Sequence, residues 1–131
     1  MNYQIIIIGT ADNTKQMCQL LIETDVKMDL IISIQTTVLQ NNHISGYSDI
    51  VDFANKIGIA IFLVSRYKLD DIETNTFFKN KTFDLGICVS WQRLSPKTIL
   101  DQFNFGIFGM HGSSGFLPFD KGRSPMNWSF I

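Results

Sequence analysis

The sequence has few cysteines, few prolines and no long apolar run. Its two cysteines, Cys18 and Cys88, are far apart and have no histidine at metal-ligand spacing, which argues against a C-x-x-C redox pair and against a zinc site. The apolar run near the N-terminus, Ile5 to Ile8, is too short to cross a bilayer, and no charged segment precedes it. We therefore expect a cytoplasmic protein with two buried, reduced thiols, no metal and no membrane segment.

The sequence also has no excess of positive charge. Lysine and arginine together number 11 against 12 acidic residues, so no net positive field attracts nucleic acid. The chain of 131 residues is 45% hydrophobic and 12% aromatic, which is enough for a packed core. We predict one domain over residues 1–131. Its charge makes nucleic-acid binding unexpected, although it does not exclude tRNA.

Five short apolar segments alternate with segments of helical character. The predicted strands are residues 4–9, 30–34, 59–64, 85–89 and 105–108. The predicted helices begin at Asp12 or Asn13, at Ser48 or Asp49, at Asp70, and at Ser95 and Pro96. This alternation predicts an α/β fold, a Rossmann-like open and mainly parallel sheet with helices on both faces.

The helical spacing of apolar residues predicts which side chains face the core. In the first helix these are Met17, Leu20 and Leu21, and in the third they are Leu69, Ile72 and Phe77. Because open parallel sheets bind ligands beyond the carboxyl ends of their strands, the segments to search are 9–14, 90–94 and 109–124. The first lacks the second and third glycines of G-x-G-x-x-G, which argues against a nicotinamide cofactor and favours a simple helix entry.

A histidine follows the last predicted strand. Residues 108–118 read F-G-M-H-G-S-S-G-F-L-P and place His111 near glycines that let a ligand approach the backbone closely. A histidine here can stabilise or carry charge, although an isolated histidine is more often structural. Neither Ser113 nor Ser114 has the G-x-S-x-G spacing of a hydrolase nucleophile, and His111-Gly112 matches a lipase oxyanion loop only as a dipeptide.

The segment that follows joins a turn to a helix start. Residues 122–128 read G-R-S-P-M-N-W, with Ser124 as the expected cap and Pro125 in the first turn. By itself this pattern describes an ordinary helix entry. Its short distance behind His111 makes it a candidate for the same site.

Three ordered motifs, His111-Gly-Ser113, Leu117-Pro118 and G-R-S-P-x-N-W at 122–128, resemble the active-site signature of the folate-dependent formyltransferases. This family includes the methionyl-tRNA, glycinamide-ribonucleotide and nucleotide-sugar N-formyltransferases. Residues 84–91 also resemble the strand and loop that line the family's folate pocket. The resemblance extends over nearly the whole chain and is strongest from Asp84 onward.

The resemblance implies that a primary amine attacks the formyl carbon of 10-formyltetrahydrofolate, with His111 as hydrogen-bond donor or proton carrier. Four consecutive residues would contact the folate: Trp91, Gln92, Arg93 and Leu94. Three others would line the substrate pocket: Gly109, Ser113 and Arg123. The implied partners are this folate cosubstrate and a primary amine, on an amino-sugar nucleotide or on methionyl-tRNA. The lack of a basic surface favours the amino-sugar nucleotide or a similar small amine, and no metal is expected.

Two departures from the family pattern leave a second hypothesis open. The family usually has asparagine two residues before the histidine, where this chain has Gly109, and its catalytic aspartate lies in a loop beyond the end of this sequence. We therefore expect the chain to be a truncated catalytic domain that is inactive alone. The alternative is a non-catalytic folate- or partner-binding module of the same fold. The apolar end and the unfinished sheet also suggest a homo-oligomer.

Overall fold

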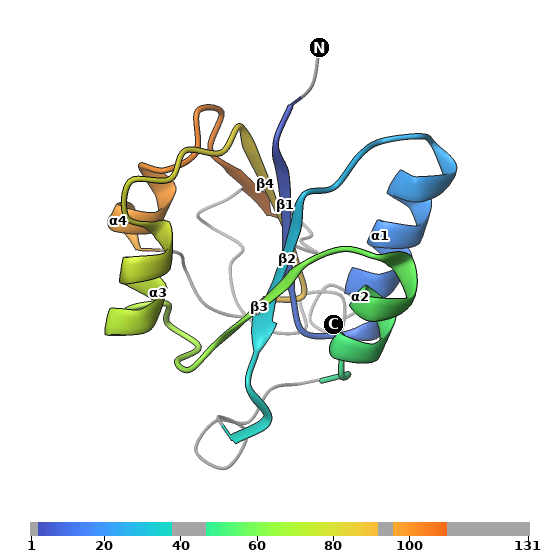
Figure 1. Ribbon diagram of the computed structural model, residues 1–131, viewed down its shortest axis with the longest axis horizontal. Coiled ribbons are helices and arrows are strands. Elements are labelled where there is room, and N and C mark those ends of the chain that lie inside the picture. The colour runs from blue at the N-terminus through green and yellow to red at the C-terminus, as the bar shows by residue number, and fades with distance from the viewer. Residues whose placement is uncertain (1–2, 38–46, 92–95, 110–131) are drawn as a thin grey trace, which may run out of the picture.

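The computed structural model describes residues 3–37, 47–91 and 96–109. They form a five-stranded, all-parallel sheet with helices on both faces (Figure 1). The elements in chain order are β1 (Ile5–Gly9), α1 (Asp12–Glu23), β2 (Leu30–Ile34), α2 (Val51–Ile57), β3 (Ile61–Val64), α3 (Ile72–Phe78), β4 (Leu85–Val89), α4 (Lys97–Leu100) and β5 (Ile107–Gly109). The predicted α/β class and the Rossmann-like sheet are confirmed.

The strands lie in the order β3-β2-β1-β4-β5. β1 is central because its isoleucines are apolar on both faces, as a strand covered on both sides requires. Ile6, Ile7 and Ile8 are all at most 1% exposed. The chain builds the sheet outward from β1 to β3, then crosses back to place β4 on the other side of β1.

The sheet separates two hydrophobic clusters. α1 and α2 lie on one face, to the right in Figure 1, and α3 and α4 lie on the other. The larger cluster, which includes Ile6, Ile8, Phe78 and Trp91, packs with α3 and α4, and the smaller includes Ile7, Cys18, Ile31 and Ala54. The prediction that Cys18 is buried is confirmed, whereas Cys88 is only partly buried.

Two predicted inward side chains point outward. Leu20 is 53% exposed and Ile72 is 84% exposed. In each helix a pair of buried residues four positions apart sets the inward face, Thr14 with Cys18 in α1 and Thr74 with Phe78 in α3. Residues two positions from such a stripe lie on the opposite side of a helix. The apolar spacing therefore predicted the two helices, but it assigned one exposed side chain of each to the inward face.

Several element boundaries also differ from the predicted ones. Ala11 is the N-cap of α1, not Asp12 or Asn13. α2 begins at Val51, two residues after Asp49, whose carboxylate accepts a hydrogen bond from the Val51 N–H. The last strand covers residues 107–109 instead of 105–108, because Gly106 adopts a φ of 82° that places the preceding residues in a turn.

Candidate functional site

The candidate site lies where the direction of strand addition reverses, between β1 and β4. Gly9 at the end of β1 pairs with Val89 at the end of β4. In open α/β sheets the crevice beyond the carboxyl ends of two such strands is the usual place for a ligand. The predicted segments that begin at Gly9 and Ser90 therefore meet at one edge of the sheet.

The turn from β1 into α1 is held closed by Thr14. Its hydroxyl accepts a hydrogen bond from the Ala11 N–H at 3.4 Å and donates one to the Val89 carbonyl at 3.0 Å. Thr14 is fully buried, and the Cβ that an alanine at position 9 would carry overlaps its side chain. One side chain thus joins the β1 turn to the end of β4 and fixes the floor of the crevice.

Replacing Thr14 with valine is expected to lower the free energy of unfolding by about 1–3 kcal/mol, because the buried Val89 carbonyl and Ala11 N–H lose their partner. The measurement is urea unfolding, with a lower midpoint at an unchanged slope. Thr24→Val is the matched control. The Thr24 hydroxyl bonds the Leu20 carbonyl at 2.8 Å but is exposed, so its loss should change stability by less than about 0.5 kcal/mol. Equal losses in both variants would contradict this role for Thr14.

A second bridge between the two strand ends involves Thr10 and Ser90. The Thr10 hydroxyl donates to the Ser90 carbonyl at 2.9 Å, and the Thr10 carbonyl accepts from the Ser48 N–H at 2.7 Å. Ser90 has a φ of 61°, in the left-handed region that residues other than glycine rarely adopt. Such conformations persist where the surroundings hold them and are common at functional sites. Ser90 turns the chain away from β4 at the crevice.

Trp91 is a core residue whose side chain is 9% exposed. Its indole N–H donates to the Tyr67 carbonyl at 3.1 Å, and the two rings meet edge to face with centroids 4.9 Å apart. The side chain therefore anchors the loop after β4 to the loop after β3. Any contact of Trp91 with a ligand in the crevice would have to come mainly from its backbone.

Gly109 ends β5 beside Cys88 of β4. A Cβ at Gly109 would have no described atom within 4 Å. Burial raises the pKa of the Cys88 thiol to about 11, although a hydrogen bond from the Trp91 backbone opposes this shift. The thiol is therefore protonated at neutral pH, which makes it a poor nucleophile.

The remaining predicted site residues lie outside the described residues. These are Gln92, Arg93, Leu94, His111, Ser113 and Arg123. Of the predicted set, the structure therefore places Trp91, two residues after the end of β4, and Gly109, at the end of β5, both at the carboxyl edge of the sheet.

Sequence reasoning missed the residues that build the floor of the crevice, Thr10, Thr14 and Ser90. A threonine three positions after a strand-to-helix turn is a weak indication of a capping interaction. The left-handed conformation of Ser90 has no indication in the sequence, because it depends on the tertiary contact with Thr10.

No helix in the described ranges is long and apolar enough to cross a membrane. Within the same ranges, no group of three or more histidine, cysteine, aspartate or glutamate side chains could hold a metal ion.

Comparisons with known proteins indicate the family. No protein-family model matches the chain. The methionyl-tRNA formyltransferase of Clostridium perfringens is 33% identical over 86 residues, which is 66% of this chain and 27% of that protein. The methionyl-tRNA formyltransferase of Mycoplasma genitalium is 24% identical over 130 residues, 98% of this chain and 40% of that protein. These similarities support a formyltransferase family for the chain.

A solved formyltransferase has the same fold. Glycinamide ribonucleotide transformylase 1 from Geobacillus kaustophilus superposes on 99% of this chain and 68% of its own with a TM-score of 0.69, at 13% sequence identity. At this identity the superposition shows a shared fold. The chain spans 27% and 40% of the length of the two curated relatives.

Proposed function

We propose that this chain is part of an enzyme that transfers a formyl group from 10-formyltetrahydrofolate to a primary amine. The observation that carries the proposal is the match to a methionyl-tRNA formyltransferase along 98% of the chain. The crevice between the ends of β1 and β4 supports it, because that is where this class of sheet binds ligands. In this proposal residues 1–131 are the catalytic-domain portion of the enzyme.

The acceptor amine forms a bond to the formyl carbon, the bond from that carbon to the folate nitrogen breaks, and the nitrogen leaves with a proton. In this proposal His111 donates a hydrogen bond to the oxyanion of the tetrahedral intermediate or carries the proton. The folate lies along the backbone of residues 91–94. Ser113 and Arg123 line the amine side together with Gly109.

The proposed acceptor is an amino-sugar nucleotide or another small amine. The net charge of −1 supports this choice, because tRNA binding draws most of its affinity from contacts with phosphates. Methionyl-tRNA remains the second candidate, since the curated relatives carry that name. A competition assay with both acceptors distinguishes the two.

Gly109 offers a specific test of the oxyanion site. In the resembling enzymes an asparagine stands at this position, and here no described atom lies within 4 Å of the place of its Cβ. We expect Gly109→Asn to fold normally and to raise formyl-transfer turnover at least about tenfold, since one oxyanion donor is worth a factor of 10² to 10³ elsewhere. The measurement is kcat of the protein expressed from its complete gene. Unchanged or lower kcat at unchanged stability would show that the oxyanion has another donor.

Folate binding is tested by isothermal titration of the 131-residue chain and of the protein from its complete gene with a stable 10-formyltetrahydrofolate analogue. We expect weak binding to the chain and tighter binding to the complete protein. A reduced folate without the formyl group is the control ligand. If neither protein binds the analogue, the proposed function fails and only the fold remains. Binding without transfer in the complete protein would instead support the non-catalytic module.

A further inference from the structure

A groove lies between α3 and α4, on the outer side of the layer that covers one face of the sheet. Its volume is about 420 Å³. Among the described residues its lining comes from α3 and its C-terminal end, and from α4 and the turn after it. These residues are Ile72, Asn75, Thr76, Phe78, Lys79, Thr98 and Gln102. The groove lies outside the crevice proposed as the active site.

One stripe of α3 faces the groove. Ile72, Asn75, Thr76 and Lys79 recur at positions i, i+3, i+4 and i+7, the spacing of a single helix face. All four are exposed, and Ile72 is the most exposed large apolar side chain described, at 84%. Phe78 below them is only 2% exposed and forms an apolar floor. An apolar contact and several hydrogen-bonding groups thus lie in one line.

The opposite wall is polar. Thr98 is exposed, and Gln102 is half-buried with its side-chain amide donating to the Thr98 carbonyl at 3.4 Å. The amides and hydroxyls on both walls can donate and accept hydrogen bonds, as the backbone of an extended peptide requires.

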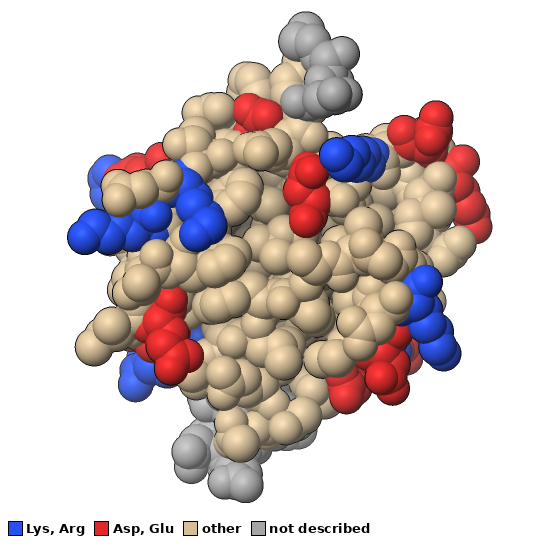
Figure 2. All heavy atoms as spheres, in the orientation of Figure 1, with Lys and Arg blue, Asp and Glu red and all other residues tan. Residues whose placement is uncertain are grey.

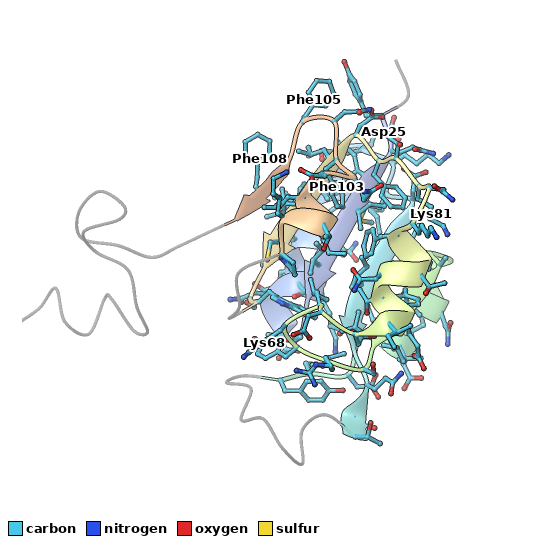
Figure 3. All side chains as sticks on the ribbon, turned by 90° about the vertical axis from the view of Figure 1, so that its left-hand side faces the viewer. Asp25, Lys68, Lys81, Phe103, Phe105 and Phe108 are labelled. Carbon is cyan, nitrogen blue, oxygen red and sulfur yellow. The ribbon has the colours of Figure 1, made fainter. Side chains whose placement is uncertain are left out.

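Positive charge gathers at the C-terminal end of α3. Lys79 and Lys81 have no carboxylate within 4.0 Å among the described residues, and the Lys81 ammonium lies 4.5 Å from the centre of the Phe77 ring. Lys97 of α4 is paired with Asp101 at 2.8 Å. On this side of the molecule Figure 2 shows basic side chains mainly in the upper part and acidic side chains in the lower part, and Figure 3 shows Lys81 on the side that α3 and α4 form.

We propose that this groove binds an acidic peptide segment of a partner protein. One apolar side chain of the segment packs against Ile72 and Phe78, and its carboxylates face Lys79 and Lys81. Charge complementarity selects this occupant, because the two lysines leave positive charge that the described carboxylates do not balance. The exposed apolar Ile72 lies on the same helix face, two turns before Lys79, and favours an amphipathic peptide over a nucleic acid backbone, which would need no apolar anchor.

The test is titration of the ¹⁵N-labelled 131-residue chain with a synthetic peptide that alternates pairs of glutamate with single leucine and phenylalanine residues. We expect amide shifts at Asn75, Thr76, Lys79, Thr98 and Gln102, with binding that weakens as salt rises. A peptide with lysine in place of every glutamate is the control and should leave these amides unshifted. A short single-stranded RNA and the chain alone at increasing concentration test a nucleic acid and a second copy as occupants.

Matched variants locate the contact. Ile72→Ser combined with Lys79→Glu should weaken acidic-peptide binding at least about tenfold. Leu20→Ser combined with Lys56→Glu changes an exposed apolar residue on α1 and an exposed lysine on α2, and should leave acidic-peptide binding unchanged. Circular dichroism checks that both double variants fold. If the Ile72→Ser and Lys79→Glu double variant does not fold, Lys79→Glu alone takes its place. The proposal is overturned if the groove amides do not shift, if the lysine peptide or the RNA shifts them equally, if dilution alone removes the shifts, or if the control variant loses binding as strongly.

Discussion

Replacing Trp91 with alanine is expected to lower the free energy of unfolding by about 3–5 kcal/mol. The indole is 9% exposed and belongs to the larger core cluster together with Phe78 and Phe103. Its removal leaves a cavity and takes away the N–H that the Tyr67 carbonyl accepts at 3.1 Å. Because Trp91 joins the loops after β3 and β4, the variant should also loosen the edge of the crevice. The measurement is urea or thermal unfolding followed by circular dichroism.

Trp91→Phe is the matched control for the hydrogen bond. It keeps an aromatic ring in the core and removes the indole N–H, so a smaller loss of about 1–2 kcal/mol is expected. If the alanine variant lost no more stability than the phenylalanine variant, the side chain would not hold the core as the structure indicates.

Replacing Gly9 with alanine is expected to lower the free energy of unfolding by about 3 kcal/mol, even though only one methyl group is added. The new Cβ would overlap the Thr14 hydroxyl and the Val89 carbonyl oxygen and would lie 2.6 Å from the Thr14 methyl carbon. The carbonyl is fixed because Val89 pairs with Gly9 in the sheet. The Thr14 side chain could move only by breaking both of its hydrogen bonds. Relief of the clash therefore has to separate β1 from β4 at the crevice.

Gly109→Ala provides the comparison, because a Cβ there has no described atom within 4 Å. Its stability should differ from that of the unmodified chain by less than about 0.5 kcal/mol. A similar loss in both variants would mean that glycine is required at these positions for backbone freedom and not for close packing. A double variant, Gly9→Ala with Thr14→Ser, should recover part of the loss, because it removes the methyl group of Thr14.

The sheet could be predicted because its strands carry the chemistry of a buried parallel sheet. The apolar runs at 5–9, 30–34 and 85–89 have no polar alternation, so each strand had to be covered on both faces. The direction of the side chains on the short helices was harder to predict. Ile72 satisfies the apolar spacing of α3, but the Asp71 cap and the buried Thr74 and Phe78 turn it outward. Those contacts involve residues that the sequence alone does not bring together.

The candidate site was predictable only in its position on the sheet. The rule for open sheets placed it at the carboxyl ends of the strands, and the pairing of Gly9 with Val89 brings two of the three searched segments together. The floor of the crevice depends on Thr14 reaching the Val89 carbonyl, 75 positions away in the sequence. Long-range hydrogen bonds of this kind leave no spacing pattern. The formyltransferase resemblance came instead from motifs that follow β5 in the sequence, and the curated relatives support it independently.

The rule for open sheets and the formyltransferase resemblance indicate the same edge of the sheet. Trp91 and Gly109, named from the resemblance, follow β4 and end β5, at the same edge of the sheet as the Thr10, Thr14 and Ser90 contacts. The proposed chemistry needs a rigid crevice. The contacts that fix the crevice are therefore expected to support turnover as well as stability.

The most direct test of formyl transfer is an assay of the protein expressed from its complete gene, unmodified and with His111→Ala, using 10-formyltetrahydrofolate and a panel of amino-sugar nucleotides and methionyl-tRNA. We predict formylated amine with the unmodified protein and a loss of kcat of at least about 10²-fold in the variant at unchanged folding. No formylated amine with any acceptor, or equal turnover by the two proteins, would contradict the proposed role of this chain and of His111.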